Sequence, residues 1–486
     1  MRYTQVSSSN AIYRLGQKRL QSHNGSLHDN DVASHSKKGS GQPGRRYLGA
    51  AVVLSILFLG YIAISNDVKP VRMGKSAIDT LAFSFNFQKP FYVVVIDAGS
   101  TASRVIAFNF HESILNGKPI LDGELFHQIK PGLSSFADKP SEGAKTLQAL
   151  LEKAKTVVPK SEWSRTPLVM KATAGLRLLP DHKANSLLKE CRQLFETSGF
   201  LVTKNSVSIM EGTDEGIFSW FTVNYLLDKL GSHSSEETVA ALDLGGGSTQ
   251  ITFAPAEEHI KREKRHIYSI NAFSHNMSVY THSYLGMGLM AARKEILTYN
   301  ISQEELNNHD LVEVRSECVN PIVSTEWNYG GHNYLVKGPI NGMHKIVKTQ
   351  NFAGTDEDRP VVRFPECLKI VKSYIEKIKE KPLNLKSHDI YAFSYYFDRA
   401  TEVGFIDPFS GGIITPDAFL KAAMDTCDYP NTDQPFMCLD LTFIYVLLRD
   451  GFHLEPTTKL NLYKKINGHE ISWALGAAFN VLQNGL

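Results

Sequence analysis

One pattern occurs twice in this chain and constrains its fold more than any other feature. Residues 93–108 read VVVIDAGSTASRVIAF, and residues 239–254 read VAALDLGGGSTQITFA. Each copy is an apolar, β-branched run, a small-residue turn that opens with an aspartate, and a second apolar run, which is typical of a β-hairpin. Asp97 and Asp243 occupy the same place in the two copies. The repeat therefore predicts two related half-domains that face each other.

Both turns are rich in groups that bind phosphate. Glycine accepts backbone conformations that a Cβ atom forbids, so successive N–H groups can wrap around phosphate oxygens. A plain β-turn would explain either copy alone, but two copies with matching flanks argue against it. One carboxylate from each half suits a hydrated divalent cation such as Mg²⁺. The pattern predicts a cleft for a cation-bearing polyphosphate, with Asp97 and Asp243 at the metal and further donors from Ser100, Thr101, Gly245, Gly246, Gly247, Ser248 and Thr249.

An acidic segment lies between the two hairpins. Residues 209–220, IMEGTDEGIFSW, place three carboxylates between a strand-like and a helix-like run. Hydrolysis of a phosphoanhydride needs a base that orients and deprotonates water. Glu215, at the start of the predicted helix, is best placed for this role. Stabilisation of a helix N-terminus is the alternative reading; it is favoured for Asp214 and stays open for Glu211.

A second small-residue turn precedes that segment. Residues 169–177, VMKATAGLR, end an apolar run with a hydroxyl and a basic side chain. Thr173 is predicted to donate to the terminal phosphate. For Arg104 and Arg177, a phosphate contact and a structural ion pair are equally good readings, and both stay open.

The N-terminal region predicts a membrane anchor. Residues 47–64, YLGAAVVLSILFLGYIAI, carry no charge over a length that crosses a bilayer as a helix. The tail at 1–46 has eight Lys/Arg against two Asp/Glu, which predicts that it is cytosolic and that the residues after the stem at 65–90 face a lumen or the outside. On that side, the sequons at Asn276 and Asn300 would be glycosylated.

The cysteine pattern agrees with an oxidising compartment, because all five cysteines follow the predicted anchor. Because no CxxC motif occurs and no histidine lies at zinc-finger spacing from these cysteines, a zinc site is not expected. Two bridges and one free thiol are predicted: Cys427 with Cys438, Cys318 with Cys367, and Cys191 left over. The chain beyond the tail is slightly acidic, which excludes a nucleic-acid reader driven by bulk positive charge.

Five motifs, in order, resemble the signature regions of the ectonucleoside triphosphate diphosphohydrolases, or apyrases: DAGSTASR at 97–104, ATAGLR at 172–177, GTDEG at 212–216, DLGGGSTQ at 243–250 and SWALGA at 472–477. The resemblance implies an α/β fold of two actin/Hsp70-like, ribonuclease-H-type domains, with a nucleotide cleft between them and a need for Ca²⁺ or Mg²⁺. We place the first domain at 91–235, completed by a C-terminal helix at 470–486, and the second at 236–469.

The resemblance also implies residue roles. Glu215 would be the catalytic base and Gln250 would help to position water. Asp97 and Asp243 would hold the cation mainly through its waters. Ser100, Thr101, Thr173 and the loop from Gly245 to Thr249 would hold phosphates. The family places a base-stacking aromatic near residues 391–399, YAFSYYFDR, where Tyr396 and Phe397 are the candidates. The alternation of this segment is typical of a half-buried strand, so core packing remains the alternative for both residues.

The resemblance is closest to a subgroup with one N-terminal anchor, because the final residues FNVLQNGL contain no second span. That subgroup resides in the Golgi or endoplasmic reticulum or is shed. It favours UDP and GDP, whose removal supports glycosylation. The expected partners are nucleoside di- and triphosphates and a membrane, with no nucleic acid. A nucleotide-driven switch or chaperone and an exopolyphosphatase are the alternatives. A switch would not need Glu215.

Overall fold

The computed structural model describes residues 3–5, 55, 79–85, 87–230, 237–260, 265–272, 275–308, 310–340, 345–350, 354–382 and 384–486. The predicted transmembrane segment at 47–64, except Ser55, lies outside the described residues, as do nearly all of the basic tail and most of the stem. Among the helices that are described, none is both long and apolar enough to span a membrane.

The chain divides into two compact units. One comprises Met1–Val6, Pro90–Phe110 and Ile120–Leu486, and the other comprises Ser7–Lys89 and His111–Pro119. In the second unit, the Asp79 carboxylate accepts hydrogen bonds of 2.9 Å from the Ser113 hydroxyl and the Ile114 backbone N–H. All the predicted site residues belong to the first unit.

The first hairpin forms the centre of a five-stranded sheet. Strands β2 and β3 pair antiparallel, with Asp97 opposite Arg104. The β-branched run in β2 is fully buried, which explains why it shows no polar alternation. The strand order is β4–β3–β2–β5–β6, with bounds Pro119–Ile129 (β4), Ser103–Glu112 (β3), Phe91–Ala98 (β2), Leu168–Ala172 (β5) and Val207–Ile209 (β6).

The second hairpin forms the centre of an eight-stranded sheet. Strands β7 and β8 pair antiparallel, with Asp243 opposite Gln250. The strand order is β1–β9–β10–β8–β7–β16–β18–β17, with bounds Tyr3–Gln5 (β1), Ile267–Ala272 (β9), His275–Leu285 (β10), Ser248–Phe253 (β8), Ala240–Leu244 (β7), Ile390–Ser394 (β16), Leu460–Leu462 (β18) and Gly412–Ile414 (β17).

The duplication extends beyond the hairpins. In each sheet the aspartate-bearing strand has an antiparallel neighbour on one side and two successive parallel strands on the other: β5 and β6 beside β2, and β16 and β18 beside β7. The five strands β10–β8–β7–β16–β18 therefore repeat the order of the first sheet. Both predicted hairpins are confirmed.

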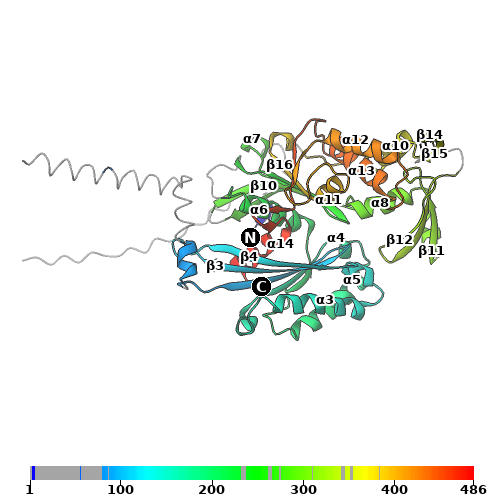
Figure 1. The fold of residues 1–486 in the computed structure, drawn as a ribbon. Coiled ribbons are helices and arrows are strands. Elements are labelled where there is room, and N and C mark those ends of the chain that lie inside the picture. Colours follow the sequence, from blue (N-terminus) through cyan, green and yellow to red (C-terminus); the bar gives the residue numbers. More distant parts are fainter. Residues whose placement is uncertain are drawn as a thin grey trace, which may run out of the picture. The chain divides into compact units, whose positions relative to one another are not determined.

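Helices separate and cover the two sheets (Figure 1). Helices α6 (Gly212–Leu226) and α14 (Trp473–Asn484) lie in one apolar cluster with residues of both sheets, such as Val93 of β2 and Val279 of β10. The outer face of the first sheet is covered by α3 (Pro140–Lys155) and α5 (Asp181–Glu196). The C-terminal helix α14 packs on α6 and on β2 of the first sheet.

Five helices cover the outer face of the second sheet: α8 (Leu289–Leu297), α10 (Phe364–Ile375), α11 (Tyr395–Glu402), α12 (Pro416–Cys427) and α13 (Met437–Val446). Two small sheets are added to this side of the second sheet. One consists of β11 (Leu311–Arg315), β13 (His332–Lys337) and β12 (Ser324–Tyr329), and the other consists of β14 (Lys345–Gln350) and β15 (Asp356–Val361). The remaining short elements are α4 (Ala174–Arg177), α7 (Glu257–Ile260), α9 (Gln303–Asn308), β19 (Lys465–Ile466), β20 (His469–Glu470), η1 (Leu133–Phe136), η2 (Lys160–Arg165), η4 (Leu385–Ser387) and η5 (Leu447–Gly451).

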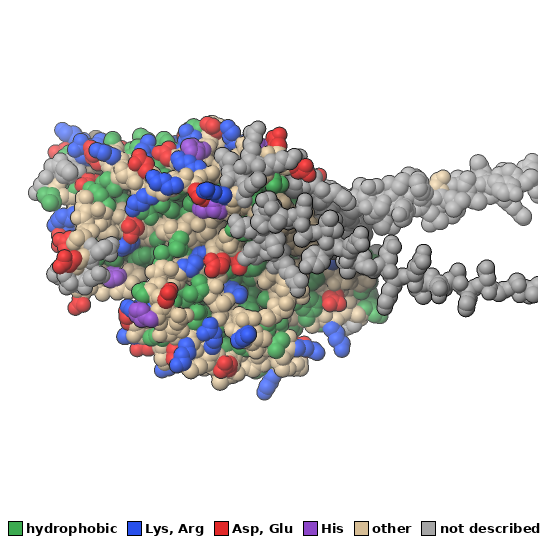
Figure 2. Space-filling model, turned by 180° about the vertical axis from the view of Figure 1, so that it is seen from behind, with side chains coloured by type: hydrophobic (Ala, Val, Ile, Leu, Met, Phe, Trp, Pro, Cys, Tyr) green, Lys and Arg blue, Asp and Glu red, His purple; other side chains and the backbone are tan. Residues whose placement is uncertain are grey.

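The structure contains both predicted disulfides, and Cys191 is buried and free. The bridges join Cys318 to Cys367 and Cys427 to Cys438. Basic and acidic side chains are interspersed on the face of the molecule that Figure 2 shows. Asn276 and Asn300 are both exposed.

Candidate active site

A pocket of about 440 Å³ lies where the two hairpin turns meet. The approach is so close that a Cβ atom on Gly246 would lie 2.2 Å from the Ser100 hydroxyl oxygen. A larger residue at this position would force the Ser100 hydroxyl to turn away. Twelve of the predicted residues line the pocket: Asp97, Ser100, Thr101, Arg104, Thr173, Glu215, Asp243, Gly245, Gly246, Gly247, Ser248 and Phe397.

The two turns are closed by the same backbone contact. The Gly99 N–H donates to the Ala102 carbonyl over 3.1 Å, and the Gly245 N–H donates to the Ser248 carbonyl over 3.0 Å. Thr173 lies directly before α4 and is 7% exposed, and it lines the pocket. The pocket wall thus carries the hydroxyl and backbone donors that suit phosphate oxygens.

Glu215 lies at the centre of a hydrogen-bonded group. Helix α6 begins at Gly212, which places Glu215 in its first turn. Its carboxylate accepts from Arg177 Nη2 at 2.5 Å and from Gln250 Nε2 at 3.0 Å. Arg177 thus forms an ion pair with the predicted base.

The surroundings of Glu215 raise its affinity for a proton. Burial raises the pKa of Glu215 to about 8; the Arg177 charge opposes this shift, and the charges of Asp243 and Asp97 add to it. A carboxylate with a raised pKa accepts a proton from water more readily than an ordinary one. Such a shift in a cleft is typical of catalytic groups.

Gln250 holds the Glu215 carboxylate by a hydrogen bond from outside the pocket. It does not line the pocket, and its Nε2 atom lies 2.7 Å from the Ser248 hydroxyl and 2.9 Å from the Ser283 hydroxyl. Its Oε1 atom is buried and has no hydrogen-bond partner among the described residues. Gln250 thus acts on Glu215 through its Nε2 group, behind the pocket wall.

Asp97 and Asp243 have the chemistry of a cation site. Arg104 donates to Asp97 Oδ2 over 2.9 Å, while the buried Oδ1 atom has no partner among the described residues. Asp243 accepts from Ser394 at 2.7 Å and from Ser219 at 3.3 Å. Burial raises the pKa of Asp243 to about 6, and the Asp97 charge adds to this shift. Two buried carboxylates with an unpaired oxygen fit a divalent cation.

Besides Gln250, two of the predicted residues, Tyr396 and Thr249, do not line the pocket. The segment predicted as one strand ends at Ser394, whose φ of 58° starts α11 in a new direction. This turn buries Tyr396 in the apolar core at 0% exposure, whereas Phe397 lines the pocket. Thr249 is also fully buried, and its hydroxyl donates to the Asp243 carbonyl over 2.8 Å instead of facing a phosphate.

Sequence reasoning missed several residues around the site. Ser394 and Ser219 hold Asp243, and Ser283 contacts Gln250. Single serines carry no local signal, so only the fold reveals them. Tyr395 and Tyr463 line the pocket, and Tyr395 belongs to the aromatic run from which the two neighbouring residues were chosen.

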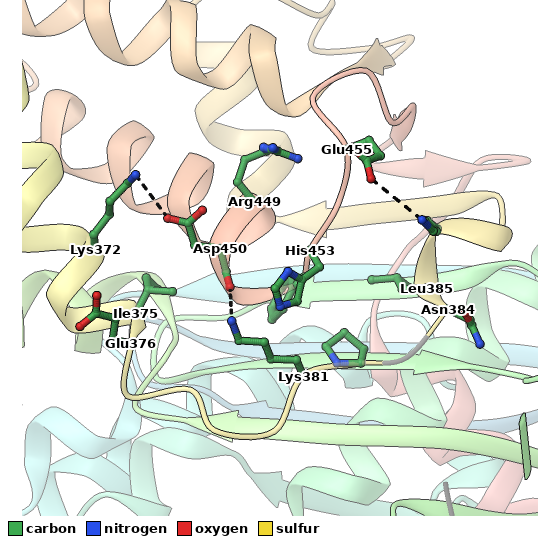
Figure 3. A pocket seen from close by; sticks show the side chains of 13 residues that line it. Lys372, Ile375, Glu376, Lys381, Asn384, Leu385, Arg449, Asp450, His453 and Glu455 are labelled. Atoms are coloured by element: carbon green, nitrogen blue, oxygen red, sulfur yellow. Dashed lines mark hydrogen bonds and ion pairs between the residues drawn. The ribbon is translucent and has the colours of Figure 1, made fainter. Parts of the chain in front are cut away.

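A larger pocket, of about 830 Å³, lies elsewhere on the second half (Figure 3). None of the predicted site residues lines it. Several of its charges are paired: Lys372 lies 3.7 Å from Asp450, and Lys381 Nζ donates to the Asp450 carbonyl over 2.8 Å. Its size alone does not point to chemistry, whereas the smaller pocket contains a base, two carboxylates and phosphate donors.

Several known proteins are similar to this chain over most of its length. Human nucleoside diphosphate phosphatase ENTPD5 is 42% identical over 81% of this chain and 88% of its own length. Nucleoside-diphosphatase uda-1 of Caenorhabditis elegans is 38% identical over 80% of this chain and 81% of its own. Human ectonucleoside triphosphate diphosphohydrolase 6 is 37% identical over 87% and 84%, respectively.

A solved structure shares the fold. The nucleoside triphosphate hydrolase structure from Neospora caninum superposes with a TM-score of 0.52 at 13% identity, covering 86% of this chain and 97% of that one. The family pattern itself matches residues 86–485, which include both hairpins, the pocket and the C-terminal helix. The chain belongs to the GDA1/CD39 (nucleoside phosphatase) family.

Proposed function

We propose that this enzyme hydrolyses the terminal phosphoanhydride of nucleoside diphosphates such as UDP and GDP, and of triphosphates more slowly, with a divalent cation. The observation that carries the proposal is the position of Glu215. It lies in the pocket where the two phosphate-binding turns meet, and both Arg177 and Gln250 hold its carboxylate. The names of the relatives point to the same substrate class.

The proposed reaction is an in-line attack of water on the terminal phosphorus. The backbone N–H groups and hydroxyls of the two turns hold the phosphate chain. Glu215 takes a proton from the attacking water, while Arg177 and Gln250 Nε2, which both donate to its carboxylate, keep that carboxylate oriented. A Ca²⁺ or Mg²⁺ ion near Asp97 and Asp243 would supply positive charge that stabilises the phosphate oxygens. The P–O bond to the leaving nucleoside phosphate then breaks.

Aromatic side chains at the pocket could hold the nucleobase. Phe397, Tyr395 and Tyr463 all line it, and the Tyr395 hydroxyl lies 3.4 Å from the Thr101 hydroxyl. We propose that one of these rings stacks on the base, in place of the buried Tyr396. Stacking accepts every base, so it is consistent with activity on both UDP and GDP.

We further propose that the enzyme works in the lumen of the Golgi or endoplasmic reticulum, anchored by residues 47–64 as a type II protein, with a shed form as a variant. Two disulfides and two exposed sequon asparagines are consistent with that compartment. In that lumen the enzyme would remove the nucleoside diphosphates that glycosyltransferases release.

We also propose that the two sheets form the pair of actin/Hsp70-like domains that the sequence predicts.

A substrate panel tests the proposed activity. Phosphate release by the full chain in detergent would be measured with UDP, GDP, ADP, ATP and inorganic polyphosphate, each with Mg²⁺ and with Ca²⁺. We expect the fastest release from UDP and GDP and none in excess EDTA. Release from polyphosphate without release from nucleotides would contradict the proposal.

A further inference from the structure

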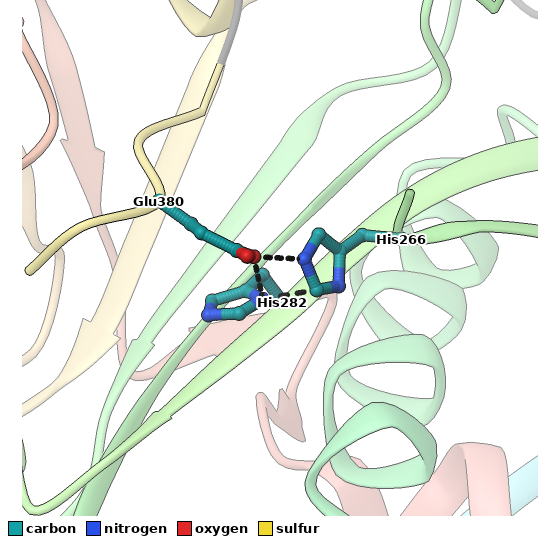
Figure 4. Close-up of side chains that lie close together, drawn as sticks. All are labelled: His266, His282 and Glu380. Atoms are coloured by element: carbon teal, nitrogen blue, oxygen red, sulfur yellow. Dashed lines mark hydrogen bonds and ion pairs between the residues drawn. The ribbon is translucent and has the colours of Figure 1, made fainter. Parts of the chain in front are cut away.

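A second group of ligand-type side chains lies outside the pocket. His266, His282 and Glu380 point toward one another from three separate segments (Figure 4). One possible ligand atom from each residue lies within 4.8 Å of the others. The two Nδ1 atoms are 3.1 Å apart, and Glu380 Oε2 lies 4.0 Å from His282 Nδ1 and forms a short contact with His266 Nε2. None of the three lines the pocket described above.

The two histidines are held in place by the second sheet. His282 lies in β10, where the Tyr284 ring packs edge-on against it at 4.2 Å. His266 directly precedes β9, and its carbonyl accepts from the Thr281 N–H over 2.9 Å. Its φ of 61° is a costly conformation for a residue with a Cβ atom. With this backbone conformation, the His266 imidazole lies with its Nδ1 atom 3.1 Å from that of His282.

The segment that carries Glu380 is anchored independently. It follows α10, where the Tyr374 hydroxyl donates to the Gly286 carbonyl over 2.6 Å. The next residue, Lys381, donates to the Asp450 carbonyl over 2.8 Å. The carboxylate is therefore brought to the histidines by contacts on both sides of it. Because each ligand has its own support, the arrangement is organised before any ion binds.

We propose that His266, His282 and Glu380 bind a divalent transition-metal ion of the Zn²⁺ class, with water completing its coordination. Two imidazoles and one carboxylate suit Zn²⁺, whereas Ca²⁺ and Mg²⁺ prefer oxygen ligands only. Ligands about 2.0 to 2.1 Å from a tetrahedral ion lie about 3.3 Å from one another, so small side-chain shifts complete the site. The Glu380 side chain is 43% exposed, which leaves room for water.

This site is distinct from the predicted catalytic cation site. Side chains alternate along β10, so His282 shares a face with Tyr284 while Ser283 points to Gln250 on the opposite face. The catalytic carboxylates Asp97 and Asp243 belong to the pocket on that opposite side. A bound ion at the histidines would clamp the segment after α10 to β10.

Metal titration of the full, untagged chain tests the proposal. Zn²⁺ binding would be measured by calorimetry with Mg²⁺ in excess, and ligation of Co²⁺ by its visible absorption. We expect one Zn²⁺ per chain at this site. His282→Gln and Glu380→Gln should each weaken its binding at least about tenfold and change the Co²⁺ spectrum. The control His332→Gln replaces an exposed histidine elsewhere and should leave binding unchanged.

Asp97→Ala separates this site from the pocket. We expect it to retain Zn²⁺ binding at the histidines. Zn²⁺ binding that survives both His282→Gln and Glu380→Gln, or that is lost in Asp97→Ala, would overturn the proposal, as would the absence of Zn²⁺ binding to the native chain. The melting temperature of each variant without metal checks folding, and Glu380 is exposed enough that its change should not disturb the core.

Discussion

At the scale of single residues, opposing charges set the state of Glu215. Burial and the two neighbouring aspartates favour its protonated form, while Arg177 favours the ionised form. The side chain is 8% exposed, so solvent screens these interactions little. A bound cation would add to the effect of Arg177 and lower the pKa of Glu215 from about 8.

Replacing Arg177 should move the pH dependence of the reaction. Without the arginine, the pKa of Glu215 rises, because a favourable charge next to the ionised form is lost. A base must be deprotonated, so the acid limb of kcat/KM for UDP should move to higher pH in Arg177→Met. The limb should move less in Arg177→Lys.

A pH profile for each variant measures this shift. The control Arg165→Met removes an exposed arginine that pairs with Glu162 outside the pocket, and its profile should match that of the native enzyme. An acid limb that stays in place in Arg177→Met would show that Arg177 does not control the titrating group.

At the scale of elements, α6 and α14 pack closely enough to exclude a side chain. A Cβ atom on Gly476 would lie 2.5 Å from the Phe218 carbonyl oxygen. The Gly476 N–H also donates to the Thr222 hydroxyl over 3.0 Å. This contact keeps the C-terminal helix against the helix that carries Glu215.

We expect Gly476→Ala to lower the free energy of unfolding by about 1–3 kcal/mol, because the contact is with backbone that cannot rotate away. Chemical denaturation measures the loss. Gln483→Ala, at an exposed position of the same helix, should change stability by less than about 0.5 kcal/mol. Equal stability of the two variants would contradict the close packing.

The helices and strands differ in how well the sequence predicts them. Both hairpins and the start of α6 were predicted correctly, because each depends on a short local pattern of apolar residues, glycines and acids. The run at 391–399 was not, since the same alternation suits a strand or a strand followed by a helix. What decides it is Ser394, whose strained φ accompanies a hydrogen bond to Asp243, far away in the sequence.

Contacts between residues that are far apart in the sequence could not be predicted from local sequence patterns. The ion pair of Arg177 with Glu215 was only one of two readings, and the contact of Ser283 with Gln250 had no signal at all. His266, His282 and Glu380 show no metal-binding spacing along the chain. Such groups form only when the second sheet brings separate segments together.

At the scale of the whole molecule, Cys191 reports on global unfolding. It is fully buried in the core between the first sheet and its outer helices, and burial raises its pKa to about 12. Because thiolate is the reactive form, we expect no labelling by a thiol reagent in the native protein. Labelling should begin only along the unfolding transition. Rapid labelling under native conditions would contradict the packing of α5.

The buried carboxylates should also make stability depend on pH. The pKa of Glu215 rises from 4.5 to about 8 on folding, and that of Asp243 rises from 3.8 to about 6. The folded state therefore binds these protons more tightly, and their contribution to stability is fully present below pH 4 and is lost as the pH rises to about 8.

A cation that binds the ionised carboxylates should offset this loss. We expect Mg²⁺ or Ca²⁺ to raise the melting temperature more at pH 8 than at pH 5, and Asp243→Asn to reduce the difference. Thermal unfolding at both pH values, with cation and with EDTA, measures it. The same increase at both pH values would argue against a cation held by these groups.

The central claim is that Glu215 activates the attacking water, and single-turnover hydrolysis of UDP by Glu215→Gln tests it most directly. Glutamine keeps the size of the side chain but cannot accept the proton, so the rate should fall by about 10²- to 10⁴-fold while UDP binding changes little. Glu211→Gln, the same change at an exposed position four residues earlier, should keep a rate close to that of the native enzyme. A native rate in Glu215→Gln would contradict the account.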